Sequence, residues 1–129
     1  MTSDLIEETL ACTTLADCAP GSRLNVERAM KFGDEIGGHL VAGHVSSTAT
    51  IERINEGENG KTLSLNSTPA HVQNILPKGF IAIDGISLTV GEVDHANSSF
   101  EVHLIPETLR ITTIADKQVG DQVNIELDP

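Results

Sequence analysis

The chain has 129 residues, which fits one domain, or two if both are small. Its net charge of −11 has the wrong sign for binding a nucleic-acid backbone, so we expect no nucleic-acid partner. Three Phe are its only aromatic rings of the Phe, Trp and Tyr type, so a planar ligand would have to be held mostly by aliphatic side chains and backbone.

The N-terminal region contains a stretch that returns near the end of the chain. Residues 4–27 match residues 103–126 at an offset of 99, with 12 of the 24 positions identical. We therefore interpret residues 1–37 as the remnant of a first repeat unit plus a connector, and residues 38–129 as a whole second unit. By the repeat, residues 4–27 should form the end of a strand, a short helix and a last strand.

The two cysteines, Cys12 and Cys18, lie in this N-terminal region and form no C-x-x-C pair. That usage predicts two reduced thiols in a cytoplasmic protein. The chain has no window of 18 apolar residues and no basic-then-apolar leader, so we expect a cytoplasmic location and no membrane partner.

From residue 39 onward, short alternating segments predict β-strands. In the clearest of them, Ile86, Leu88 and Val90 face one side while Ser87 and Thr89 face the other. Six short strands with little helix predict a small antiparallel barrel. The expected strands cover residues 39–54, 61–67, 80–84, 86–94, 99–105 and 122–127.

Two short helices are predicted between these strands. In residues 67–76, Thr68 is placed to cap the helix and Pro69 to occupy its first position, and we expect Val72, Ile75 and Leu76 to share one side. Residues 106–116 begin with Pro-Glu, which suits a first helical turn, whereas their β-branched residues limit the length of the helix.

The pair His39 and His44 suggests a metal site at first sight. In the strand expected here, a separation of five residues places the two rings on opposite faces, and no third ligand lies nearby in the sequence. We therefore predict no metal site. On the residues alone, the two histidines could equally be hydrogen-bonded strand residues without a chemical role.

Two further features could carry chemistry. Beyond the Asp-Gly turn at 84–85, Ser87 and Thr89 share a face that is either simply solvated or borders a groove. At residues 104–109 a strand passes into a helix, whose first N–H groups are free to bind a ligand, although such junctions are common.

Taken together, GGHLVAGHV (37–45), KGFIAIDGISLTVGEV (78–93), HLIPETLRITTI (103–114) and VNIELDP (123–129) resemble riboflavin synthase of the bacterial two-barrel type. The resemblance covers the whole chain in order and spacing. It implies an all-β fold, a six-stranded antiparallel Greek-key β-barrel with two short helices. In that family a subunit has two such barrels, each binding one 6,7-dimethyl-8-ribityllumazine, and a C-terminal helix that helps form a trimer.

The resemblance also implies a reaction that needs no cofactor. Two lumazines meet between barrels, a four-carbon unit passes from one to the other, and riboflavin and 5-amino-6-ribitylamino-uracil leave. The catalytic residues implied by motif are His39, His44, Ser87 and Asp128. The substrate-binding residues implied are Gly43, Val45, Thr89, Ile105, Glu107 and Thr108.

The chain departs from the family pattern at both ends. Most of the first barrel is missing, and Pro129 stands where the trimer-forming helix should begin. We expect lumazine or riboflavin binding with reduced or no turnover, and a homo-oligomer, either a dimer or a swapped assembly. Apolar residues of the first remnant should find a partner chain or stay disordered: Leu5, Ile6, Leu10 and Leu15.

Two rival functions remain open at this point. One is a non-catalytic lumazine- or flavin-binding protein of the lumazine-protein type, which shares the double-barrel fold. The other is a structural module that keeps the barrel but binds no ligand.

Overall fold

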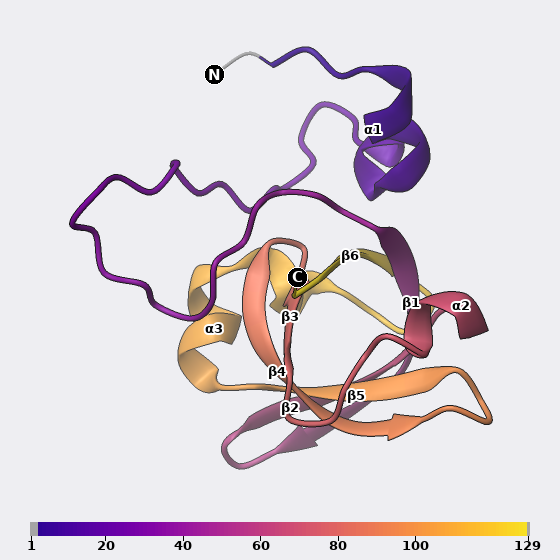
Figure 1. Cartoon of the computed structure of the whole chain (residues 1–129). Coiled ribbons are helices and arrows are strands. Elements are labelled where there is room, and N and C mark those ends of the chain that lie inside the picture. The colour runs from indigo at the N-terminus through magenta and orange to yellow at the C-terminus, as the bar shows by residue number, and fades with distance from the viewer. Residues whose placement is uncertain (1–2, 129) are drawn as a thin grey trace.

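The barrel is closed and wholly antiparallel in the computed structural model, which describes residues 3–128 (Figure 1). Its strand order is β1-β2-β5-β4-β3-β6, and this confirms the predicted all-β, six-stranded fold. The strands are β1 (Ser47–Gly57), β2 (Gly60–Asn66), β3 (Phe80–Ile83), β4 (Ile86–Asp94), β5 (Ser99–Leu104) and β6 (Gln122–Leu127).

The barrel interior is filled by the inward-facing side chains of these alternating strands. Phe100, Val102 and Leu104 of β5 are each at most 1% exposed. Leu88 and Val90 of β4 are buried, whereas Thr89 between them is exposed, as the alternation predicts. Burying side chains of this size stabilises the fold by about 1.5–3 kcal/mol each. The core therefore fixes which residues of β4 face outward.

Helix α2 (Pro69–Val72) lies between β2 and β3 and starts as predicted. The Thr68 side chain accepts a hydrogen bond from the His71 N–H, and Pro69 occupies the first turn. The helix ends sooner than the pattern indicates, so Leu76 is 66% exposed while Ile75 is buried. The expectation that Leu76 shares the buried side is therefore wrong.

The first strand begins later than predicted. Residues 39–46 lie outside any strand, and β1 starts at Ser47. Gly43 has φ +83°, a left-handed conformation that an extended strand does not use. Some backbone N–H groups of this stretch bond to side chains of the barrel instead: His39 N–H to Ser87 and Ala42 N–H to Glu126.

The two copies of the repeat form the same local structure. Helices α1 (Glu7–Cys12) and α3 (Pro106–Ile111) are each followed by a short 3-10 helix, η1 (Thr14–Asp17) and η2 (Thr113–Asp116). Thr13 caps η1 with φ −125° and Thr112 caps η2 with φ −122°. Each threonine hydroxyl also donates to the carbonyl four residues earlier, at 2.7 Å.

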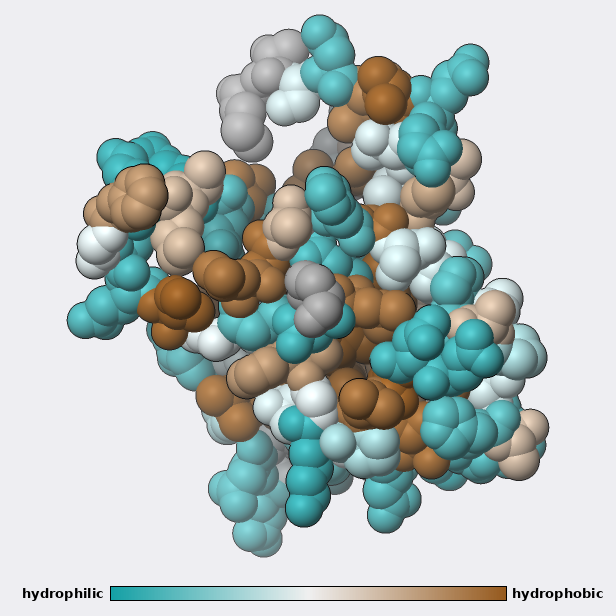
Figure 2. Space-filling model, in the orientation of Figure 1, coloured by the Kyte–Doolittle hydropathy of each residue, from teal (hydrophilic) through white to brown (hydrophobic). Residues whose placement is uncertain are grey.

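The last strand expected in the first repeat is absent among the described residues. Residues 22–27 form no strand, because the part of the chain that the structure describes offers no neighbouring strands for them to pair with. Leu24 is 54% exposed and Val26 is 65% exposed, whereas their counterparts Val123 and Ile125 are buried. Figure 2 shows hydrophobic surface on the N-terminal part of the molecule as well as over the barrel.

Other apolar residues of the N-terminal region are also exposed, including Leu5, Ile6 and Leu10, while Leu15 is half-buried. Cys12 and Cys18 are free thiols. Across residues 3–128, none of the helices has the length and apolar character needed to cross a bilayer.

Candidate ligand-binding site

The outer face of the β3–β4 hairpin carries the two hydroxyl residues Ser87 and Thr89, which were predicted to lie at a ligand site. The strands pair with Ala82 opposite Ser87 and Phe80 opposite Thr89. Because Leu88 and Val90 point into the core, Ser87 and Thr89 are held on the outside, as predicted. Ser87 is nevertheless half-buried, since another segment of the chain passes over it.

That covering segment, residues 38–46, brings His39 onto Ser87. The Nδ1 atom of His39 lies 2.6 Å from the Ser87 Oγ, and the His39 backbone N–H donates to the same oxygen at 3.2 Å. A Cβ added at Gly38 would approach the Ser87 Oγ to 2.5 Å, so a larger residue here would have to displace the Ser87 side chain. A hydroxyl and an imidazole at this distance can pass a proton between them.

Phe80 completes the cluster from the neighbouring strand. The His39 and Phe80 rings are stacked, with centroids 5.0 Å apart and planes 20° apart. Although His39 Nε2 is buried, it has no hydrogen-bond partner among residues 3–128. Buried polar atoms normally find a partner, so an unpaired nitrogen here indicates a place where a ligand group could bind.

Glu126, which was not predicted as a site residue, anchors the covering segment farther along. Its side chain is 6% exposed, and its carboxylate accepts a hydrogen bond from the Ala42 N–H at 2.8 Å. Beyond it, the Ser46 N–H donates to the Ile125 carbonyl at 2.9 Å. Alternation placed Glu126 on the polar face of β6. The one sequence signal that could have drawn attention to it is the matching Glu27 of the first repeat.

The remaining catalytic candidates lie near this cluster or on the same segment. His44 belongs to the covering segment and is exposed, between Gly43 and the half-buried Val45. Asp128 is exposed and directly follows β6, whose Leu127 pairs with Ile81 of β3. The end of β6 therefore places Asp128 beside the start of β3. Because residues 39–46 are not a strand, the predicted placement of the two histidines on opposite faces of a strand is wrong.

The three substrate-binding candidates after β5 form a separate group at the start of α3. Ile105 precedes the helix and is 60% exposed. Glu107 bonds to Arg110 of its own helix, and this hydrogen bond lowers the pKa of the Glu107 carboxyl. The Thr108 carbonyl accepts from the Thr112 hydroxyl. No hydrogen bond among residues 3–128 joins this group to His39 or Ser87.

A wide cleft of the described structure lies elsewhere. It has a volume of about 940 Å³ and runs between the first repeat and the barrel, lined by both asparagines of the repeat, Asn25 and Asn124, and by Asp84. Neither His39 nor Ser87 lines it. The cleft is therefore a feature of the contact between the repeats, and the His39–Ser87 cluster is the better candidate for chemistry.

The family model for the lumazine binding domain matches residues 42–128, which include all six strands of the barrel. The chain belongs to the lumazine-binding domain family. The matched residues include Ser87 on β4, the start of α3 and Asp128. His39 lies just outside the match.

Curated relatives extend the similarity to nearly the whole chain. The riboflavin synthase of Escherichia coli (strain K12) is 52% identical over 127 residues, covering 98% of this chain and 59% of that protein. The riboflavin synthase of Chlamydia pneumoniae is 50% identical over 129 residues, covering 97% and 60%. The chain thus spans about three-fifths of the length of the relatives it matches.

Solved structures agree with the fold. The crystal structure of LumP complexed with riboflavin superposes with a TM-score of 0.83 at 25% identity, covering 96% of this chain and 66% of that one. LumP complexed with 6,7-dimethyl-8-(1'-D-ribityl) lumazine gives a TM-score of 0.82 at 21% identity. The coverage of 96% means that the N-terminal repeat is also part of the shared arrangement.

Proposed function

We propose that this chain is a riboflavin synthase unit. It binds 6,7-dimethyl-8-ribityllumazine and riboflavin over the β3–β4 hairpin, and two such sites convert two lumazines into riboflavin and 5-amino-6-ribitylamino-uracil. The observation that carries the proposal is the contact between His39 and Ser87 in a chain 52% identical to a riboflavin synthase. Because the reaction joins two lumazines, turnover is proposed for an assembly of sites, and one barrel alone is expected to bind lumazine with reduced or no turnover.

The proposed chemistry makes modest demands on the side chains. A base must remove a proton from the acidic methyl group of one lumazine, and a hydroxyl or water must add at a ring carbon of the other. Ser87 supplies a hydroxyl 2.6 Å from an imidazole nitrogen of His39. His44 is assigned as a proton shuttle and Asp128 as the carboxylate that orients the nucleophile. Proximity of two bound rings supplies much of the remaining acceleration.

Binding of the planar ring is assigned to backbone and small or aliphatic side chains. Gly43, Val45 and Thr89 would border the ring, and Phe80 would flank it. The free N–H groups at the start of α3 suit the pyrimidine edge and ribityl chain. The residues assigned there are Ile105, Glu107 and Thr108.

The reaction needs two lumazine sites, so we propose that the chain acts as a homo-oligomer, a dimer or a swapped assembly. Residues 1–37 and 38–129 are proposed as separate repeat units. The exposed Leu24 and Val26 support this, because their counterparts in the second unit are core residues of a barrel.

The test is to incubate the full chain with 6,7-dimethyl-8-ribityllumazine and follow ligand fluorescence and riboflavin absorbance together. We expect a saturable fluorescence change and slow riboflavin formation at a rate proportional to the square of chain concentration. No fluorescence change at micromolar chain would contradict the proposal and favour a purely structural barrel.

Ser87→Ala is the matching variant, and loss of one hydrogen bond should weaken lumazine binding roughly 2- to 10-fold. Ser99→Ala is its control, because Ser99 is also a half-buried strand serine and its side chain makes no hydrogen bond among residues 3–128. Unchanged binding by Ser87→Ala would remove Ser87 from the site.

A second candidate function is a holder of lumazine or flavin that performs no conversion. The structural match to LumP complexes at a TM-score of 0.83 favours it. A one-to-one lumazine complex that is stable for hours without riboflavin formation would select this function over synthesis.

A further inference from the structure

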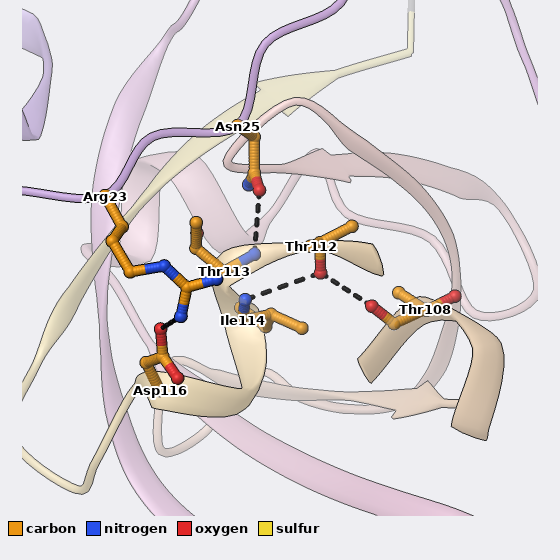
Figure 3. A network of polar contacts seen from close by, with 7 residues as sticks. All are labelled: Arg23, Asn25, Thr108, Thr112, Thr113, Ile114 and Asp116. Carbon is orange, nitrogen blue, oxygen red and sulfur yellow. Dashed lines mark hydrogen bonds and ion pairs between the residues drawn. The ribbon is translucent and has the colours of Figure 1, made fainter. Parts of the chain in front are cut away.

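The two repeats are joined by two reciprocal hydrogen bonds, here called the asparagine exchange, in which an asparagine side chain of each repeat bonds to the other repeat. Asn25 and Asn124 occupy equivalent positions of the repeat. The Asn25 Oδ1 accepts from the Thr113 N–H at 2.8 Å, and the Asn124 Oδ1 accepts from the Thr14 N–H at 2.8 Å. Each asparagine thus satisfies the first N–H of the 3-10 helix in the other repeat. Figure 3 shows the Asn25 side of this exchange, with Arg23 paired to Asp116 beside it.

The exchange is not fully symmetric, because Asn25 uses both ends of its amide group. Its Nδ2 donates to the backbone carbonyl of Asp84 at 3.0 Å. Among residues 3–128, the Asn124 side chain makes only the bond to Thr14. Asn25 therefore fixes two parts of the barrel to each other, the start of η2 and the turn at Asp84.

The turn at Asp84 is the connection between β3 and β4. Asp84 has φ 48° and Gly85 has φ 81°, the two left-handed residues of a tight hairpin. The Asp84 N–H donates to the Asn124 carbonyl at 2.9 Å, and its Oδ1 accepts from the Asn124 N–H at 2.7 Å. The turn is thus held by the backbone of β6 on one side and by the Asn25 side chain on the other.

The same hairpin presents the ligand-site hydroxyl. Ser87 lies two residues beyond Gly85, at the start of β4, and contacts His39. We propose that Asn25 is a positioning residue of the lumazine site: by bridging Asp84 and Thr113, it couples docking of the first repeat to the placement of Ser87. The ligand part of this inference rests on the proposed function, whereas the coupling to the hairpin does not.

The repeat supplies a matched control for the test. Asn25→Ala and Asn124→Ala each remove one capping bond between the repeats, but only Asn25→Ala removes the bond to the hairpin turn. The bonds that the Asn124 backbone makes to the Asp84 N–H and to the Asp84 Oδ1 remain in both variants. Asn25→Asp is a third, isosteric variant: it keeps an acceptor for Thr113 N–H but replaces the donor to Asp84.

The first measurement needs no ligand. Amide exchange and backbone chemical shifts are recorded by NMR for the full chain and the three variants. Asn25→Ala should speed exchange at Thr113 and shift the amides from Gly85 to Ser87. Asn124→Ala should speed exchange at Thr14 and leave the Ser87 amide unchanged. Unchanged Gly85–Ser87 amides in Asn25→Ala would overturn the proposal.

The second measurement is lumazine affinity by fluorescence titration. Asn25→Ala and Asn25→Asp should each weaken binding roughly 3- to 10-fold, as expected for a lost hydrogen bond, while Asn124→Ala stays within about twofold. Equal losses in Asn25→Ala and Asn124→Ala would overturn the proposal, because they would reflect general loosening of the repeat contact. Parent-like affinity of Asn25→Asp would also overturn it. If the parent chain binds no lumazine but Asn25→Ala still shifts Ser87, the coupling stands and the proposed function fails.

Discussion

The first and second repeats share half of their sequence and all of their local helical structure, yet only one of them contributes a strand. Helices α1 and α3 occupy equivalent positions, as do η1 and η2, and their capping threonines have φ values of −125° and −122°. Glycines at equivalent positions adopt similar left-handed conformations, Gly21 with φ 93° and Gly120 with φ 96°. The divergence begins just after them, where residues 122–127 form β6 and residues 22–27 form no strand.

The difference follows from where the hydrogen bonds go. A short helix and its cap satisfy their backbone groups within a few residues, so similar sequence is enough to rebuild them. A strand bonds to other strands, and β6 is paired with both β1 and β3. Residues 22–27 have no such partners among residues 3–128, and their apolar side chains remain exposed.

The sharpest way to test this comparison is to truncate equivalent apolar residues. Ile125→Ala removes a side chain that is 1% exposed and should lower the free energy of unfolding by about 2–5 kcal/mol. Val26→Ala, at the equivalent position and 65% exposed, should change it by less than about 0.5 kcal/mol. Urea unfolding measures both. A large loss in Val26→Ala would mean that residues 22–27 are packed in solution, for instance in a swapped assembly.

A smaller effect is expected from the two capping threonines. Thr112→Ala removes the hydroxyl that accepts from the Ile114 N–H, and Ile114 is buried in the barrel core. It should destabilise the chain by about 1 kcal/mol in urea unfolding. Thr13→Ala removes the same cap before the half-buried Leu15 and should only speed exchange of the Leu15 amide. If Thr112→Ala and Thr13→Ala lowered the midpoint of urea unfolding equally, both repeats would unfold as one unit.

The smallest expected effect is on the pH dependence of stability, and it comes from Asp84 in the turn that bonds to Asn124. Burial raises the pKa of the Asp84 carboxyl, against the opposing effects of the Asn124 N–H and the charge of Lys117. The folded chain therefore binds this proton more tightly than the unfolded chain. The contribution of Asp84 to stability is full below its ordinary pKa and is lost as pH rises through the raised value.

Asp84→Asn keeps an acceptor for the Asn124 N–H and tolerates the left-handed conformation. It should be more stable than the parent at neutral pH and show no gain at pH below the ordinary carboxyl pKa, by urea unfolding at both. Asp94→Asn is the control of opposite sign, because hydrogen bonds from Asn97 lower the pKa of Asp94. A loss of stability at neutral pH in Asp84→Asn would contradict the assignment.

Part of the candidate site could be predicted from the sequence and part could not. Alternation along β4 correctly put Ser87 and Thr89 outside the barrel, because a strand with a buried face has only one register. His39 was predicted with the wrong geometry, because the segment around it is not a strand and the N–H groups of His39 and Ala42 bond to side chains of the barrel. Glu126 and Asn25 were missed altogether, because each acts through a backbone group more than 55 residues away in the sequence, at Ala42 and Asp84.

The sequence by itself determined the number of barrel strands and their approximate positions along the chain, the short helices and the internal repeat, because these depend on alternation and on bonds between near neighbours. The membership in the lumazine-binding domain family agrees with the motifs that suggested it. Only the tertiary structure decided that residues 38–46 cover the β3–β4 hairpin, that His39 meets Ser87, and that Asn25 and Asn124 exchange partners. Those contacts join segments 48 to 110 residues apart, and no local pattern specifies them.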